Sequence, residues 1–145
     1  MSKIDYSVVI PSIKEDRNLL KIIPKIKKIL RKNYEIIIVG SKHKVDNSDQ
    51  ICKKLKVKFL RRKKNDYYGN AVRLGIKESK GKFIVFMDGD GSHDPSFLKK
   101  FINKSNSYDL IIASRYVQHG KTENSYLLIL LSLILNIFYS KFLGL

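Results

Sequence analysis

The sequence predicts an α/β domain built on a mainly parallel sheet. Short apolar runs alternate with amphipathic stretches along most of the 145 residues, which is the order typical of strand–helix units. One run, Phe83–Met87, is continuously apolar, as expected for a strand buried on both faces of a parallel sheet. This run ends at Asp88, and Asp90 follows one residue later. Open α/β sheets bind ligands at the carboxyl ends of their strands, so the pair marks a candidate site.

The first strand is predicted at Tyr6–Ile10 and the second at Tyr34–Val39, because both are short apolar runs. Between them, apolar residues recur at helical spacing with lysines on the other face, which predicts an amphipathic helix. These apolar residues are Leu19, Ile22, Ile23, Ile26, Ile29 and Leu30. Pro24 lies inside the pattern and is expected to kink the helix or to mark its restart.

A short helix is predicted next, with Asp46 or Ser48 as its cap. Val57–Leu60 is the predicted third strand. The basic run Arg61–Lys64 follows it and is expected to be a solvated loop.

Another helix is predicted to begin in Gly69–Gly75, ahead of the strand that carries the aspartate pair. Asp94 is expected to cap a further helix with Pro95 at its first position, where proline is tolerated. Leu110–Ala113 is predicted to be a further strand.

The segment Ser125–Ser140 carries no charge and is almost wholly apolar. It is somewhat short for a spanning helix, which needs roughly 20 residues. A helix lying in the membrane interface, or a buried helix of a larger protein, fits the pattern as well. We favour membrane association over a soluble core helix.

The net charge of +16 is consistent with nucleic acid, an anionic membrane surface or phosphorylated substrates as partners. The basic residues are dispersed and no stacking-aromatic motif is evident, so no nucleic-acid partner is expected. The single Cys52 excludes an intramolecular disulfide.

The pair Asp88 and Asp90 is suited to hold a hard divalent cation and to leave coordination sites for water and a diphosphate. Gly89 and Gly91 flank Asp90 and permit a tight turn. The alternative is an Asp-Gly turn with solvated carboxylates. An Asp-x-Asp pattern is too short to decide between the two.

Five segments in this order resemble family-2 glycosyltransferases, and most closely the dolichyl-phosphate mannose synthases and bacterial polyprenyl-phosphate glycosyltransferases. The segments are Val8–Glu15, Tyr34–Val39, Gly69–Gly75, Phe86–Pro95 and Ser114–Tyr116. The resemblance extends from about Tyr6 to Leu145.

This resemblance implies a GT-A fold, a Rossmann-like three-layer sandwich, with an apolar C-terminal helix added. Residues 1–120 would form the catalytic domain that binds a nucleotide-sugar, and residues 121–145 a membrane-associated or interface helix. The implied reaction moves a sugar from a nucleotide-diphosphate donor to a polyprenyl phosphate acceptor. The implied location is the cytoplasmic face of a membrane, to which the protein would be peripherally attached.

The resemblance assigns Pro11, Ser12 and Glu15 to the nucleoside pocket. It also implies that Gly69 and Asp88 belong to the nucleotide-binding residues. All five are expectations carried over from the family's motifs.

The resemblance further implies that Asp88 and Asp90 bind Mg²⁺ or Mn²⁺, with Ser92 where many relatives have a glutamine near that metal. Asp90 and Arg115 would be the catalytic residues. A metal and an arginine together would stabilise the charge that develops on the diphosphate. The acceptor phosphate is already anionic, so no strong general base is required.

The chain departs from the family after the second strand. Relatives usually carry two aspartates there, the first of which contacts the base. This chain has Gly40 and Ser41 instead, and Asp46 and Asp49 are out of register. Recognition of the base is therefore not explained by the family pattern.

A second departure lies in the apolar segment, where Leu128, Ile129 and Leu133 replace the family's arginines. Relatives also continue beyond the position of Leu145 with a segment that belongs to their acceptor side. The pattern therefore leaves open an inactive or truncated remnant, or a split-enzyme subunit whose partner supplies the missing segment.

Overall fold

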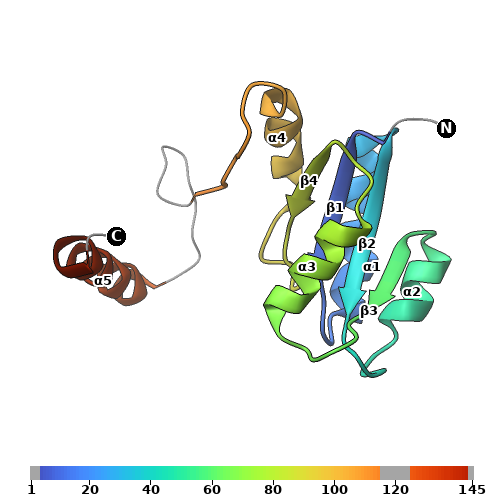
Figure 1. Cartoon of the computed structure of the whole chain (residues 1–145), viewed down its shortest axis with the longest axis horizontal. Helices are drawn as coiled ribbons and strands as arrows, with labels where there is room; N and C mark the ends of the chain where they lie inside the picture. Colours follow the sequence, from blue (N-terminus) through green and yellow to red (C-terminus); the bar gives the residue numbers. More distant parts are fainter. Residues whose placement is uncertain (1–3, 115–124, 144–145) are drawn as a thin grey trace. The chain divides into compact units, whose positions relative to one another are not determined.

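The computed structural model describes residues 4–114 and 125–143. The chain divides into two compact units, Met1–Asp109 and Leu110–Leu145. The first unit holds the sheet and most of the helices, and the second holds the last helix (Figure 1). The boundary at residue 120, between a catalytic domain and a membrane-associated or interface helix, stays a prediction.

The first unit is organised around a four-stranded parallel sheet in the order β3-β2-β1-β4. The strands are β1 (Tyr6–Pro11), β2 (Tyr34–Gly40), β3 (Lys58–Arg61) and β4 (Phe83–Phe86). The two central strands are buried on both faces, which is why they read as continuous apolar runs. The expected burial of Phe83–Met87 on both faces is wrong, because β4 lies at the edge of the sheet and leaves Ile84 and Phe86 38% and 37% exposed. The predicted α/β class with a parallel sheet is confirmed.

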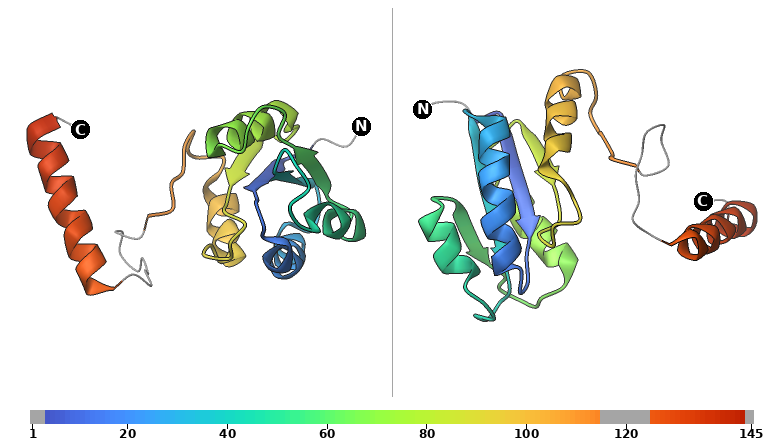
Figure 2. Two further views of the ribbon diagram at one scale, coloured as in Figure 1. Left: turned by 90° about the horizontal axis from the view of Figure 1, so that it is seen from below. Right: turned by 180° about the vertical axis from the view of Figure 1, so that it is seen from behind.

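Helices cover both faces of this sheet (Figure 2). On one face, side chains of α1 (Asp16–Leu30), α2 (Ser48–Lys54) and α4 (Leu98–Lys104) form one core cluster with β1 and β2. On the other face, α3 (Tyr68–Glu78) contributes Ala71 to a smaller cluster. The result is three layers, helix on sheet on helix.

The strand order determines where a ligand site is expected on this sheet. The chain moves outward from β1 to β2 and β3, and then returns to the other side of β1 to form β4. Strand order therefore reverses between β1 and β4, and open α/β sheets bind ligands at such a point, beyond the carboxyl ends of the strands. Met87, directly after β4, still donates its backbone N–H to Val9 O at 3.2 Å. The aspartate pair therefore begins at the sheet's carboxyl edge.

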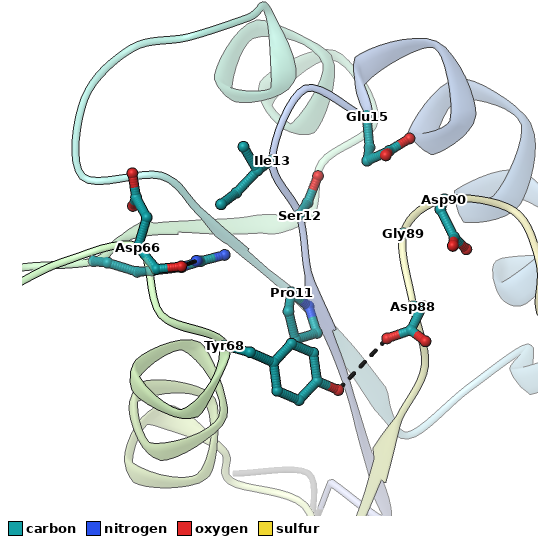
Figure 3. A pocket seen from close by; sticks show the side chains of 10 residues that line it. Pro11, Ser12, Ile13, Glu15, Asp66, Tyr68, Asp88, Gly89 and Asp90 are labelled. Carbon is teal, nitrogen blue, oxygen red and sulfur yellow. Dashed lines mark hydrogen bonds between the residues drawn. The ribbon is translucent and has the colours of Figure 1, made fainter.

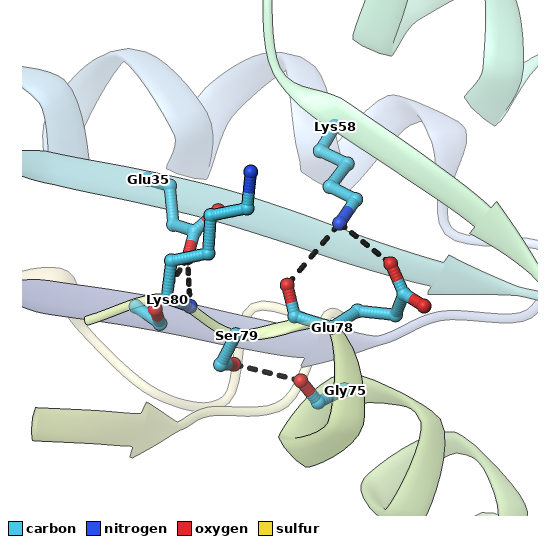
Figure 4. Close-up of polar contacts among 7 residues, drawn as sticks. Glu35, Lys58, Gly75, Glu78, Ser79 and Lys80 are labelled. Atoms are coloured by element: carbon cyan, nitrogen blue, oxygen red, sulfur yellow. Dashed lines mark hydrogen bonds and ion pairs between the residues drawn. The ribbon is translucent and has the colours of Figure 1, made fainter. Parts of the chain in front are cut away.

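At the amino ends of the strands, away from the aspartate pair, a polar network holds the connection between α3 and β4 in place (Figure 4). Glu35 Oε1 accepts hydrogen bonds from Ser7 Oγ at 2.7 Å and from the backbone N–H of Lys80 at 2.6 Å. Lys58 Nζ donates to Glu78 Oε2 at 2.8 Å and to Glu78 O at 3.2 Å. These bonds lie away from the aspartate pair, and we assign them a structural role.

Helix α1 is continuous across Pro24, so the predicted restart at this residue is wrong. Ile22, Ile23 and Ile26 lie on both sides of the proline, and all three are buried in the core. Their packing holds the helix together where one backbone hydrogen bond is lost, since tertiary packing supplies most helical stability in proteins.

The predicted cap at Asp94 is present in the structure. A short 3-10 helix, η1 (Pro95–Phe97), precedes α4, and Asp94 Oδ1 accepts the backbone N–H of Ser96 at 3.1 Å. The predicted cap at Asp94 with Pro95 in the first position is confirmed. The predicted cap of α2 at Asp46 or Ser48 is wrong, because Asn47 is the N-cap and makes no side-chain cap hydrogen bond. Asp46 lies one residue earlier, and its Oδ1 accepts the backbone N–H of Ser48 at 3.0 Å.

The predicted strand at Leu110–Ala113 is wrong. The segment has no regular secondary structure, and Leu110 and Ile112 are each 75% exposed. A strand requires a backbone partner as well as apolar residues, and none of the four paired strands in the described residues is its partner.

Helix α5 (Tyr126–Leu143) confirms the predicted apolar C-terminal helix. Its described large apolar side chains are mostly exposed, and Phe138 stacks on Phe142 at 4.7 Å between ring centroids. Within residues 4–114 and 125–143, no helix has the combined length and apolar character needed to cross a membrane.

Cys52 is fully buried in the core cluster formed with α1. Burial raises the pKa of its thiol to about 12, with a smaller contribution from Asp49 and Asp46. The thiol is therefore protonated at neutral pH, which agrees with the role of a small apolar core residue.

Gly75 allows α3 to lie directly on β1, so Gly75→Ala is expected to destabilise the fold. A Cβ at this position would overlap Val9 Cγ1. Overpacking of this kind costs about 1–3 kcal/mol, against the gain of at most about 1 kcal/mol that alanine brings to a helix. We expect a lower free energy of unfolding in urea denaturation.

Gly69→Ala is the matched control for this substitution. A Cβ there would lie 3.6 Å from Arg73 Nη1, an ordinary contact. Its free energy of unfolding should be unchanged or slightly raised. Equal effects of the two alanines would contradict the packing argument.

Candidate active site

A cavity of about 230 Å³ opens at the carboxyl edge of the sheet (Figure 3). Its walls come from the ends of β1 and β4, the loop between β3 and α3, and the start of α3. It is lined by Pro11, Ser12, Ile13, Glu15, Arg62, Asp66, Tyr68, Asp88, Gly89 and Asp90.

Asp88 and Asp90 lie on one side of this pocket (Figure 3). Asp90 Oδ1 accepts hydrogen bonds from Ser92 Oγ at 2.7 Å and from the backbone N–H of Ser92 at 2.9 Å. These bonds hold the pKa of the Asp90 carboxyl below its usual value. Gly91 has a φ of 87°, which favours glycine and lets the loop turn directly after Asp90. Asp90 is therefore ionised and fixed at neutral pH.

Asp88 has partners from two other elements. Tyr68 OH, at the start of α3, lies 3.5 Å from Asp88 Oδ1. Burial, and then the charge of Asp88, raise the pKa of this phenol. The backbone N–H of Asp88 donates to His93 Nδ1 at 3.2 Å. His93 thus supports the backbone of the aspartate loop.

The loop between β1 and α1 is tied to the aspartate loop through Asn18. Asn18 Nδ2 donates to Glu15 Oε2 at 2.6 Å and to the backbone carbonyl of Asp90 at 2.9 Å. The backbone N–H of Glu15 in turn donates to Asp46 Oδ2 at 3.1 Å. The loops after β1, β2 and β4 are therefore held in one arrangement around the pocket.

The other side of the pocket comes from the loop after β3. Asp66 Oδ2 accepts a hydrogen bond from Ser41 Oγ at 2.7 Å, and Asp66 Oδ1 accepts one from the backbone N–H of Lys42 at 2.8 Å. The bond from Ser41, followed by that from Lys42, lowers the pKa of the Asp66 carboxyl. Asp66 is therefore an anion anchored to the end of β2.

Arg62 contradicts the expectation that residues 61–64 form a solvated loop. It is only 4% exposed, because Nη2 donates to Val39 O at 3.2 Å and Nη1 donates to Asp66 O at 2.5 Å. Burial lowers the pKa of its guanidinium. Hydrogen bonds to these two backbone carbonyls compensate for the burial of the Arg62 guanidinium. The basic run in the sequence gives no sign of these partners.

The structure brings together five of the residues predicted for the site. Pro11, Ser12, Glu15, Asp88 and Asp90 all line the pocket. Two others are not among the lining residues. Ser92 acts on Asp90 through its hydrogen bonds, and Gly69 follows Tyr68 in the first turn of α3. Arg115 lies outside the described residues.

Sequence reasoning missed Arg62, Asp66 and Tyr68. A usable signal was present, because all three follow the predicted third strand and precede the next helix. In a parallel sheet such loops all emerge at the carboxyl edge, where the aspartate pair was already placed.

The donor atoms suit a hard cation, since two carboxylates of one loop line the same pocket. Among the described residues, no group of three His, Cys, Asp or Glu side chains is placed to hold a metal ion. A cation here would take its remaining ligands from water and a bound phosphate, as Mg²⁺ commonly does.

A family model for glycosyl transferase family 2 matches residues 7–143. The chain belongs to this family. The match covers nearly the whole chain and includes every element that builds the pocket.

The chain is similar to curated proteins from Pyrococcus furiosus and Methanocaldococcus jannaschii. Dolichol-phosphate mannosyltransferase from Pyrococcus furiosus is 37% identical over 123 residues, covering 81% of this chain and 35% of that protein. The uncharacterised protein MJ0544 from Methanocaldococcus jannaschii is 29% identical over 150 residues, covering 92% of this chain and 64% of that protein. The chain therefore spans about one to two thirds of the length of these relatives.

Among solved structures, glucosyl-3-phosphoglycerate synthase from Mycobacterium tuberculosis matches with a TM-score of 0.61 at 19% identity, covering 71% of this chain and 40% of that one. The same enzyme has been solved with Mn²⁺, UDP and phosphoglyceric acid. At this identity the likeness shows the fold alone.

Proposed function

We propose that this chain is the donor-binding portion of a glycosyltransferase that moves a sugar from a nucleotide diphosphate to a polyprenyl phosphate. The observation that carries the proposal is the meeting of Asp88 and Asp90 with Pro11, Ser12 and Glu15 in one pocket. The acceptor class is supported by the name of the Pyrococcus furiosus relative, a dolichol-phosphate mannosyltransferase.

The two sides of the pocket have different tasks in this proposal. Asp88 and Asp90 hold the metal and so position the diphosphate. The loop between β1 and α1, with Ser12 and Glu15, holds the nucleoside. Asn18 holds these two parts together through its hydrogen bonds to Glu15 and to the backbone of Asp90.

Mg²⁺ or Mn²⁺, when bound, would neutralise the charge that develops on the leaving diphosphate. Asp88 and Asp90 would hold the ion. Ser92 keeps Asp90 ionised and fixed, so we assign it a positioning role beside the metal. Arg115 is proposed as the second positive group at the diphosphate, and Gly69 as part of the nucleotide side.

The acceptor's phosphate oxygen is an anion and attacks without a strong general base. In this proposal the aspartates therefore bind the metal and abstract no proton. A polyprenyl acceptor resides in a membrane, and α5 offers an exposed apolar surface for attachment to one. We accordingly place the protein peripherally at the cytoplasmic face of a membrane, with residues 1–120 binding the donor and residues 121–145 facing the membrane or a partner.

A second candidate is an inactive or split relative of these enzymes. Gly40 and Ser41 stand where relatives carry aspartates, and Leu128, Ile129 and Leu133 stand where they carry arginines. In this case the chain binds a nucleotide but needs a partner subunit to complete the acceptor side.

Metal-dependent nucleotide binding tests the proposal. We expect UDP or GDP to bind the purified chain in calorimetric titrations with Mn²⁺ present, and to bind much more weakly when Mn²⁺ is replaced by a chelator. The physical reason is that a diphosphate beside two unshielded carboxylates is repelled. Equal binding with and without metal would contradict the proposed site.

A transfer assay tests the second candidate. Radiolabelled sugar nucleotide, a short polyprenyl phosphate, membranes and Mn²⁺ are incubated with the chain alone. We expect slow transfer or none. Rapid turnover by the chain alone would rule out the inactive or split relative.

A further inference from the structure

A carboxylate lies at the end of β2 in the structure, and it comes from a residue that is distant from β2 in the sequence. Gly40 ends this strand and Ser41 follows it, so neither residue carries an acidic group. Asp66 comes from the loop after β3, yet both of its carboxylate oxygens are bonded to the segment after β2, at Ser41 Oγ and at the backbone N–H of Lys42. An anion thus stands at the end of β2 although it belongs to a different loop.

Asp66 also lines the same pocket as the aspartate pair. In the view of Figure 3 it lies on one side, with Asp88 and Asp90 on the other and Pro11 and Ser12 between them. A nucleoside diphosphate whose phosphates are held at Asp88 and Asp90 would therefore direct its base towards Asp66.

Two buried polar groups of the pocket lack partners, which points independently to a ligand. Ser12 and Arg62 are each only 4% exposed. Ser12 Oγ and Arg62 Nε have no hydrogen-bond partner within the described part of the chain, and both residues line the pocket. Leaving such groups unsatisfied is costly, and a bound polar molecule would satisfy them.

We propose that Asp66 reads the nucleobase of the donor by accepting a hydrogen bond from a ring N–H. This inference rests on the proposed function and names the base class that the site accepts. Uracil and guanine carry a hydrogen on the ring nitrogen of their pairing edge, whereas cytosine and adenine carry a lone pair there. An ionised carboxylate accepts from the first pair and repels the second.

Arg62 and Ser41 support this role by holding Asp66 in place. Ser41 Oγ and Lys42 N–H fix the carboxylate and keep it ionised, so it remains an acceptor at neutral pH. Arg62 fastens the backbone of Asp66 to the end of β2 through Asp66 O and Val39 O. Both are positioning residues, since they act through Asp66.

Calorimetric titration of the full chain with UDP, CDP, GDP and ADP in the presence of Mn²⁺ tests the proposal. UDP and CDP differ only at the base edge that Asp66 would read. We expect UDP to bind more tightly than CDP, and GDP more tightly than ADP, each by roughly 10- to 100-fold, the usual effect of a charge-assisted hydrogen bond.

Asp66→Asn replaces the anion by a neutral amide that both donates and accepts, so the ratio of UDP to CDP affinity should fall by at least about 10-fold. Asp109→Asn removes the same charge from an exposed position outside the pocket and should leave the ratio unchanged. Ser41→Ala keeps the carboxylate but removes one of its anchors, and the ratio should fall less. It serves as the test variant if Asp66→Asn does not fold, as judged by its circular dichroism melting curve.

Equal affinity of the parent chain for UDP and CDP would overturn the base assignment and leave nucleotide binding intact. An equal loss for all four nucleotides in Asp66→Asn would also overturn it, because a contact to ribose or a loop rearrangement shows no base preference. Failure of every nucleotide to bind with Mn²⁺ present would overturn the proposed function together with this inference.

Discussion

Asp90→Asn is expected to abolish the metal-promoted binding of nucleoside diphosphates, with a loss of affinity of at least about 100-fold, since disturbing even a residue that supports a metal ligand costs 10- to 100-fold. Asparagine has nearly the same shape but carries no charge. Asp90 is anchored by Ser92, so the substitution removes the charge without removing the side chain. The measurement is calorimetric titration with UDP and GDP at fixed Mn²⁺ concentration. Asp88→Asn should behave in the same way.

Asp94→Asn is the matched control for these substitutions. Asp94 lies four residues beyond Asp90, caps η1 and does not line the pocket. Asparagine is an equally good cap, so stability and metal-promoted binding should both persist. If Asp90→Asn retained metal-promoted binding equal to that of the parent chain, the assignment of the metal site would be wrong.

Lysines in the middle of α5 are expected to release the protein from anionic liposomes. Leu130 and Ile134 lie four residues apart, on one face of the helix, and are 55% and 54% exposed. A lysine in the apolar part of a bilayer costs about 2.5–3.5 kcal/mol, so Leu130→Lys combined with Ile134→Lys would outweigh any gain from added positive charge. In flotation at low salt, the parent chain should move with the liposomes and the double variant should remain behind.

The matched control adds the same two charges to the first unit. Asn103→Lys and Ser107→Lys are exposed positions at and after the end of α4. This variant should bind liposomes at least as well as the parent chain, because the charges attract anionic lipids and leave α5 unchanged. If the parent chain itself stayed in the supernatant, α5 would be reassigned to a protein interface.

The central strands could be predicted because burial on both faces leaves a simple trace in the sequence. β1 and β2 are apolar at nearly every position, and the structure buries both. Helix α1 could be predicted from its period, since one apolar face recurs through 15 residues. The predicted restart at Pro24 was wrong, because a local rule for proline does not include the packing of the isoleucines around it.

Strand pairing was less predictable than strand composition. β4 and Leu110–Ala113 are both short apolar runs, yet only β4 has a backbone partner, in β1. A strand is stabilised by backbone hydrogen bonds to a neighbouring strand. The residues of a short apolar run do not show which segment will be that neighbour.

By itself, the sequence determined the parallel α/β fold, the family and the position of Asp88 and Asp90 directly after an apolar strand, because each of these depends on a local pattern. Only the tertiary structure decided that Asp66 meets Ser41, 25 positions earlier in the chain, and that Arg62 is buried beside them. The order β3-β2-β1-β4 makes β2 and β3 neighbours, so the loops that follow them emerge side by side at one edge. Contacts between loops depend on that order, which is a property of the assembled sheet.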